Sequence, residues 1–501
     1  MRHISLLLLL ALAACPFEPD DPGDAGAGGD AGPPPVELAP GETAELQTEA
    51  DAVSIRLASA GTYLVVLMSQ NERQGTTLGY STEAQKAMRS QPSDKPPAQR
   101  PAAPPRPKTE VGDTRTFSVY NGSSTITITA EATRVTARFV VWEDKTTANP
   151  FGSIDMAKVD SVIQKLEAVV VPREEQIFGA ISDVDSDGKL ALLLSYTVNQ
   201  YGARAYVSPC DIGALQGCGG GGNGGEIIYF NIPDPTDMAS SANGLTETVA
   251  HELSHLIYSY HKLILNGVSA DGENIYLTEG LAALAQDLTG YNNGNQFVWA
   301  AAIDMADYYG GDDNYSAQAL SINDMFRGST YYNADRDGAL RGGSYLFLRF
   351  VFEQMGGMQV DSSGTLTDGG GIAWIQDLYD APEQGVEALE QTTGRALWDL
   401  ALDWYTAIAA TGRGVSVDPS MVYAERFVDP ITTYSYGVDP FAALPHGVYT
   451  LHGPPVQAWD EPDGEIRAGG VEYLRIEAKP GELRLPVGGE ALARARILRL
   501  E

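Results

Sequence analysis

Three of the chain's six histidines, His251, His255 and His261, lie within eleven residues. In His251-Glu252-x-x-His255 the two imidazoles stand four positions apart, and because a helix turns about 100° per residue they share one face. Two such imidazoles can bind one Zn²⁺, while the glutamate between them acts as general base on the water that the metal activates. Four flanking apolar residues predict a buried helix: Val249, Leu253, Leu256 and Ile257. The pattern is typical of zinc hydrolases, and it needs a third ligand.

Two residues compete for the third ligand position. His261 ends a pattern typical of metzincins, His-Glu-x-x-His-x-x-Gly-x-x-His, but Tyr258 occupies the glycine position at which the chain must leave the helix. If the helix continues, His261 points about 120° away from His255 and misses the metal. Glu279 lies in the first turn of a second predicted helix, and two histidines plus one glutamate form a catalytic zinc set. We therefore expect Glu279 to bind zinc and His261 to be a surface or helix C-terminal residue.

The chain resembles the gluzincin zinc peptidases, and within them the hyicolysin-type neutral metallopeptidases. The resemblance rests on Phe178–Lys189, His251–His255 and Leu277–Ala282, extends through Gly343–Phe350, and covers roughly residues 110–412. It implies an α+β fold with a thermolysin-like catalytic domain, in which a β-sheet lobe and a helical lobe flank the zinc site. It also implies endopeptidase activity on protein or peptide substrates.

The chain departs from the gluzincin pattern around the third ligand. Thr278 stands where many gluzincins have asparagine before the glutamate ligand. Ala283 replaces the aspartate that orients the first zinc histidine in thermolysin-like enzymes. Asp287, one turn further along, is the candidate for that supporting role, and a solvated acid on the helix face is the equal alternative.

The sequence leaves the donor that stabilises the oxyanion open. Leu340 occupies the place where one gluzincin branch has a tyrosine shortly before a glycine. Tyr345 is the first candidate to replace it, and Tyr331 and Tyr332 are the alternatives.

Two acidic loops have the spacing of calcium ligands. Asp183, Asp185 and Asp187 alternate before the turning residue Gly188, as in the first half of an EF-hand loop. The twelfth position is Leu194 rather than glutamate, so a further ligand must come from elsewhere. A weaker copy of this pattern runs through Asn333, Asp335, Asp337 and Gly338.

The beginning of the chain has the features of an export signal. Residues 1–15 contain a short basic start, an apolar run and Leu12-Ala-Ala-Cys15, which has the form of a bacterial lipobox. Cleavage before Cys15 would leave a lipid-anchored protein on the cell envelope, whereas an ordinary signal peptide is the alternative. Residues 16–39 are rich in Pro, Gly and Asp and predict a disordered acidic linker. In an exported protein, Cys210 and Cys218 are expected to form a disulfide.

The remaining segments predict β modules on both sides of the catalytic domain. Residues 40–88 alternate like strands, 89–110 form a proline-rich linker, 111–415 contain the peptidase motifs, and 440–501 predict a β-sandwich-like module. Residues Glu226–Ile232 are the predicted edge strand to which a peptide substrate adds. A formal net charge of −33 excludes nucleic acid as a partner.

Two functions follow from these observations. The leading hypothesis is a lipid-anchored zinc endopeptidase in which Glu252 is the general base. The rival is a non-catalytic, calcium-dependent surface adhesin whose zinc site is structural or vestigial. A structural zinc site usually recruits cysteine and closes its fourth position, whereas this chain offers two histidines, Glu279 and an additional Glu252.

Overall fold

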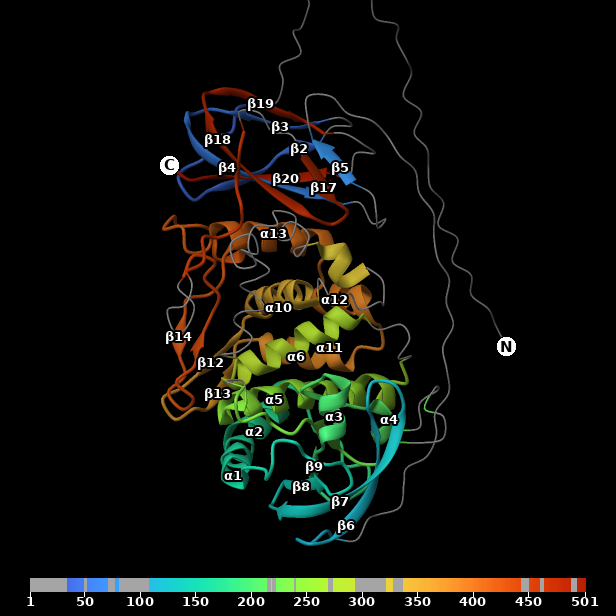
Figure 1. Ribbon diagram of the computed structural model, residues 1–501. Helices are drawn as coiled ribbons and strands as arrows, with labels where there is room; N and C mark the ends of the chain where they lie inside the picture. The colour runs from blue at the N-terminus through green and yellow to red at the C-terminus, as the bar shows by residue number, and fades with distance from the viewer. Residues whose placement is uncertain are drawn as a thin grey trace, which may run out of the picture.

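The structure is a computed structural model that describes residues 34–48, 52–70, 77–80, 108–213, 218, 222–237, 240–268, 274–292, 321–327, 337–442, 450–459, 464–487 and 493–501. These residues form an α+β protein, as the sequence predicts, with a β-sheet at one end, helices in the middle and a β-sandwich at the other end (Figure 1). No helix within these ranges is long and apolar enough to cross a membrane. The expected signal peptide, its Cys15 and most of both linkers lie outside the described residues.

A six-stranded mixed sheet forms the first layer, with strand order β10-β11-β9-β8-β7-β6. Its strands are β6 (Thr114–Tyr120), β7 (Thr125–Val135), β8 (Phe139–Asp144), β9 (Leu190–Leu194), β10 (Ala205–Val207) and β11 (Ile227–Phe230). Strand β9 runs parallel to both β8 and β11, and its Leu-Ala-Leu-Leu-Leu sequence is buried on both faces, as expected for a central strand. Strand β10 pairs antiparallel with β11 and forms one end of the sheet.

Helices lie on one side of this sheet, and α5 (Ala242–Ser259) contacts its strands β10 and β11. The others are α1 (Met156–Lys165), α2 (Val171–Phe178) and α6 (Ile275–Thr289), and the π-helical turn η3 (Tyr260–Leu265) extends α5. Ser241 and Asn274 begin α5 and α6 because their side chains accept hydrogen bonds from free backbone N–H groups in the first turn. Helix α5 packs between the sheet and α6, which in turn packs against α10 (Asp337–Gln354). The central helix α5 is therefore held on both sides.

Three further helices complete the middle layer: α11 (Gly371–Asp380), α12 (Gly385–Thr393) and α13 (Leu397–Ala410). Helix α13 is buried along nearly its whole length, which fits its position between the helical layer and the sandwich (Figure 1).

The two ends of the chain form a single β-sandwich, so the expectation of separate modules at 40–88 and 440–501 is wrong. One sheet has the order β1-β20-β4-β18-β16 and the other the order β19-β3-β2. The first contains β1 (Thr43–Glu45), β4 (Gly61–Ser69), β16 (Gln457–Ala458), β18 (Val471–Ala478) and β20 (Ala493–Arg499), and the second contains β2 (Gln47–Thr48), β3 (Ala52–Leu57) and β19 (Gly481–Pro486). Strand β4 lies between β18 and β20, so neither segment can form this sandwich alone.

The sandwich is fixed to α13 by apolar and charged contacts. Alternate residues of β4 face opposite ways: Val65 belongs to the sandwich core, whereas Val66 belongs to the core of the helical layer. Arg496 of β20 pairs with Asp403 of α13 at 2.5 Å, and both side chains are buried. The sandwich and the helical layer therefore share one continuous interface.

Glu174 of α2 is a fully buried acid. Its side chain is 0% exposed and neither carboxyl oxygen has a hydrogen-bond partner among the described residues. Burial raises the pKa of this carboxyl well above its usual range, because the charged form would lose its hydration.

Replacing Glu174 with glutamine should change how stability depends on pH. The pKa of Glu174 is higher in the folded state than in the unfolded state, so its contribution to the free energy of unfolding is fully present below the unfolded-state pKa of about 4.3. This contribution is lost as the pH rises through the folded-state pKa. Glu174→Gln removes this loss, because glutamine does not titrate. The loss amounts to about 1.4 kcal/mol for each unit by which the folded-state and unfolded-state pKa values differ. We expect the melting temperature of the variant to exceed that of the native protein at pH 8 but not at pH 4. Parallel pH profiles for the two proteins would contradict this expectation.

Candidate metal centre

Helix α5 presents His251 and His255 from one face. Leu253 between them and the flanking Val249, Leu256 and Ile257 are buried, so the helix is fixed against the sheet and α6 with the histidine face turned toward α6. The two Nε2 atoms face each other at 3.2 Å, and the rings lie nearly perpendicular with their centroids 4.8 Å apart. Two imidazole nitrogens at this separation have room for one ion between them.

Glu279 of α6 completes a group of three potential metal ligands. Its Oε2 lies 3.3 Å from His251 Nε2, and its Oε1 lies 3.6 Å from His255 Nε2. Metal–ligand bonds of about 2.0–2.1 Å in a tetrahedron separate the donor atoms by about 3.3 Å, which is close to all three separations. The described part of the chain thus brings together the residues expected from the sequence as a candidate metal-binding group.

The three ligands influence one another's protonation. Burial opposes the charge on Glu279, but the hydrogen bond from His251 and the nearby positive charges hold the pKa of Glu279 well below its usual range. Burial lowers the pKa of His255 to about 4. For His251, burial favours the neutral form, yet the Glu279 carboxylate raises its pKa overall. An ionised carboxylate and a neutral imidazole are the forms that bind metal ions.

Glu252 lies beside this group and is 7% exposed. Burial raises the pKa of Glu252 to about 7. The backbone N–H of Val207, in β10, donates a hydrogen bond to its carboxylate. Glu252 is therefore held next to the end strand of the sheet.

Arg341 of α10 is the charged neighbour that the sequence interpretation missed. Its Nη1 lies 2.8 Å from Glu279 Oε2, and its side chain is 31% exposed. The residue directly follows Leu340, the position where a tyrosine was sought, so a search for any donor in that turn would have found it. Its guanidinium brings a fixed positive charge to the rim of the group.

Gln286, and not Asp287, supports His251. Its Oε1 lies 3.4 Å from His251 Nδ1, and its Nε2 donates to the backbone oxygen of Glu247 at 3.0 Å, which orients the amide. Asp287 instead pairs with Arg349 of α10 and accepts a hydrogen bond from Tyr434 at 2.6 Å. The expected role of Asp287 is therefore wrong, because one residue along a helix turns the side chain by about 100°.

Removing the Gln286 amide should weaken metal binding. We expect Gln286→Met, which keeps the length of the side chain, to reduce zinc affinity by about 10- to 100-fold, as for other groups that orient a ligand histidine. Competition with a chromogenic chelator measures the affinity. Gln376→Met is the matched control, since Gln376 donates to Gln176 on the protein surface. Equal affinities in all three proteins would show that Gln286 does not orient His251.

Tyr345 does not face the metal group. It is buried, and its hydroxyl makes a hydrogen bond to Asp287, on the side of α6 where Arg349 and Tyr434 lie. The expectation that Tyr345 donates to an oxyanion is therefore wrong. Tyr331 and Tyr332 lie outside the described residues.

His261 is positioned away from the metal group, as expected. Helix α5 continues into η3, and His261 Nδ1 lies 2.6 Å from Asp380 Oδ1 of α11. Its side chain is only 13% exposed, so of the two expected positions it has the helix C-terminal one, in η3, rather than the surface one. The pairing with Asp380 explains its orientation.

The end strand beside Glu252 is β10, whereas the sequence favoured Glu226–Ile232. Strand β11, at Ile227–Phe230, is paired on both sides, with β9 and with β10. Strand β10 pairs with β11 and has no further strand on its other side in the described sheet. The segment that follows it contains the Cys210–Cys218 disulfide expected from the sequence.

The predicted calcium loops have different outcomes. Asp183 and Asp185 group with Glu226, while Asp187 turns one oxygen toward the backbone N–H of Lys189 at 2.8 Å. For the weaker copy, Asn333 and Asp335 lie outside the described residues, and α10 begins at Asp337.

The candidate metal centre combines two nitrogen donors, one carboxylate ligand and a second buried carboxylate beside the end strand of the sheet. A mixed nitrogen and oxygen set of this kind suits Zn²⁺ better than Ca²⁺ or Mg²⁺, which prefer oxygen alone. No protein-family model matches the chain, and no curated protein matches it either.

Proposed function

We propose that this protein is a zinc-dependent endopeptidase with a thermolysin-like catalytic domain. The observation that carries the proposal is the convergence of His251, His255 and Glu279, with Glu252 buried beside them. Three protein ligands with an open position are typical of catalytic zinc, whereas structural sites close all four. The resemblance to hyicolysin-type gluzincins supports the same conclusion from the sequence.

The arrangement of layers supports the thermolysin-like assignment. The sheet lies on one side of α5, and helices α6 and α10 lie on the other (Figure 1). The candidate metal group is contributed by α5 and α6, while β10 lies next to Glu252. This corresponds to a β-sheet lobe and a helical lobe with the site between them.

Strand β10, Glu252 and the metal ion would each have a separate role in catalysis. A peptide substrate would pair with the free edge of β10 through main-chain hydrogen bonds, which brings its scissile bond near Glu252. Glu252 would accept a proton from the attacking water and pass it to the leaving amine. A Zn²⁺ ion held by this group supplies Lewis-acid activation of the water and of the scissile carbonyl.

Arg341 is the residue that would stabilise negative charge on the substrate. Its guanidinium lies at Glu279, on the helical side of the group, and its side chain is partly exposed. A fixed donor of this kind stabilises charge that develops on a carbonyl oxygen without reorganising during the reaction.

Removal of the metal should abolish activity. We expect the purified chain to hydrolyse casein, 1,10-phenanthroline to stop the hydrolysis, and stoichiometric Zn²⁺ to restore it, because Glu252 alone cannot activate water sufficiently. The non-chelating 1,7-isomer is the control. A zinc-loaded chain that cleaves neither casein nor a peptide library would instead support the adhesin hypothesis.

A further inference from the structure

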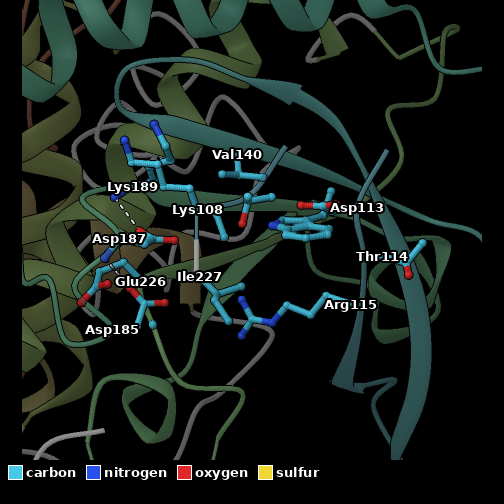
Figure 2. A pocket seen from close by; sticks show the side chains of 14 residues that line it. Lys108, Asp113, Thr114, Arg115, Val140, Asp185, Asp187, Lys189, Glu226 and Ile227 are labelled. Carbon is cyan, nitrogen blue, oxygen red and sulfur yellow. Dashed lines mark hydrogen bonds between the residues drawn. The ribbon is translucent and has the colours of Figure 1, made fainter. Parts of the chain in front are cut away.

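A second group of acidic residues lies where strands β9 and β11 of the six-stranded sheet begin, beside a cavity of about 500 Å³ (Figure 2). Strands β9 and β11 run parallel, so the loop that precedes β9 and the residue that precedes β11 meet at the same edge. Asp185, Asp187 and Glu226 line the cavity, and Asp183 belongs to the same loop. One carboxylate oxygen from each of Asp183, Asp185 and Glu226 lies within 4.8 Å of the others.

Glu226 is the residue that distinguishes this group from an ordinary acidic turn. It is 2% exposed, and its Oε1 accepts a hydrogen bond from the backbone N–H of Val184 at 3.0 Å. Its Oε2 is buried and makes no well-formed hydrogen bond to any described residue, although the Ser182 hydroxyl is near enough to lower the pKa of the carboxyl. A buried carboxylate oxygen that only the Ser182 hydroxyl approaches is costly to keep charged, and a cation at this oxygen would stabilise it.

Two cationic side chains that line the cavity, Lys189 and Arg115, donate to backbone carbonyls, and Lys108 lines the cavity as well. Lys189 Nζ donates to the backbone oxygens of Thr136 and Ala137 at 2.5 and 3.1 Å. Arg115 Nη2 donates to the backbone oxygens of Asn223 and Gly224 at 2.6 and 3.0 Å.

We propose that Asp183, Asp185 and Glu226 form a calcium site that ties the loop before β9 to the start of β11. The donors are all oxygen, which favours Ca²⁺ over zinc. Oxygens bound to one Ca²⁺ at about 2.4 Å lie at most about 4.8 Å apart, and the three carboxylate oxygens lie within that limit. Water from the cavity can fill the remaining positions of a coordination shell of about six to eight oxygens.

Gly225 permits the close approach that this site requires. A Cβ atom there would lie 2.5 Å from Asp185 Oδ2, and the residue has a φ of +108°, which side-chain-bearing residues rarely adopt. Only glycine therefore lets the strand β11 segment pass directly beside Asp185.

The site differs from the expected EF-hand-like loop in one ligand. Asp187 is replaced by Glu226, which is distant in the sequence and adjacent in space. An ion at this position would therefore crosslink the starts of β9 and β11. Strand β11 also pairs with β10, the end strand beside Glu252.

Calcium titration of the metal-depleted full chain tests this assignment. We expect isothermal calorimetry to find a saturable calcium site that Mg²⁺ fills poorly, because Mg²⁺ demands shorter bonds and a rigid octahedron. Glu226→Gln and Asp183→Asn should each weaken binding by about 100-fold, since each removes a charged ligand. Asp187→Asn should weaken it by less than about tenfold, through charge alone. Asp361→Asn, in an exposed turn, is the matched control and should change nothing.

Three results would overturn the proposal: no saturable calcium binding, unchanged affinity in Glu226→Gln and Asp183→Asn, or a larger loss in Asp187→Asn than in either. Because Asp183 is exposed, its variant keeps the fold even if Glu226→Gln does not. Zinc content is measured in the same samples and should stay constant, since the two groups share no residue. A failure here would therefore leave the proposed peptidase function intact.

Discussion

Glu252→Gln is expected to lose nearly all peptidase activity while it keeps its zinc. Glutamine preserves the shape of the side chain and can still accept the hydrogen bond from Val207, but it cannot take up a proton. General base catalysis contributes about 10²- to 10⁴-fold, so kcat should fall by that factor. The substrate KM should change little, because binding to β10 uses the main chain. Steady-state kinetics on a fluorogenic peptide and metal analysis of the same preparation measure both quantities.

Glu175→Gln is the matched control for this experiment. Glu175 lies on α2, which packs against α5, and it forms a partly exposed pair with Arg138 at 2.5 Å. Pairs of this kind contribute about 0–1 kcal/mol, so activity should remain close to that of the native protein. Full activity in Glu252→Gln with normal zinc content would rule out Glu252 as the base.

The two histidines of the metal group, which are close in the sequence, could be predicted from the sequence. His251 and His255 share a face because of helical spacing alone, and the buried residues between them fix that face. Glu279 required one further step, which was to recognise that Tyr258 lacks the flexibility of the glycine expected for the His261 alternative. The geometry agrees with this reasoning, since η3 continues the helix and His261 pairs with Asp380.

The end strand could not be predicted, for a physical reason. Glu226–Ile232 has the stronger strand pattern because β11 is buried on both faces and paired on both sides. A continuous apolar run is typical of a central strand, whereas an end strand is often short. Strand β10, at Ala205–Val207, is too short to stand out from its surroundings in the sequence.

Contacts between distant segments were the other source of error. Strand β4 pairs with β18 and β20, which lie about four hundred residues later in the chain, and no local pattern encodes such a pairing. Tyr345 and Asp287 carry suitable chemistry but lie with Arg349 and Tyr434, on a different side of α6 from the metal group. Residue type was a sufficient guide only where helical spacing also determined direction.

The third ligand gives the second large expected effect. Glu279→Ala should lower zinc affinity by orders of magnitude, because it removes one of three ligands and leaves Arg341 facing the two histidines without the carboxylate that pairs with it. His261→Ala should retain about one zinc per chain. It should cost about 1–2 kcal/mol of stability, since it removes a largely buried ring and its hydrogen bond to Asp380.

Metal analysis of both variants after dialysis distinguishes the two ligand assignments, with circular dichroism as the check on folding. Loss of zinc in His261→Ala with retention in Glu279→Ala would contradict the assignment and favour the metzincin pattern. The geometry argues against that outcome. To reach the metal, His261 would have to leave Asp380 and reverse direction within a continuous helix, at Tyr258, which is itself buried in the core. Glu279 needs no rearrangement, because both its oxygens already face the histidine nitrogens at 3.3 and 3.6 Å.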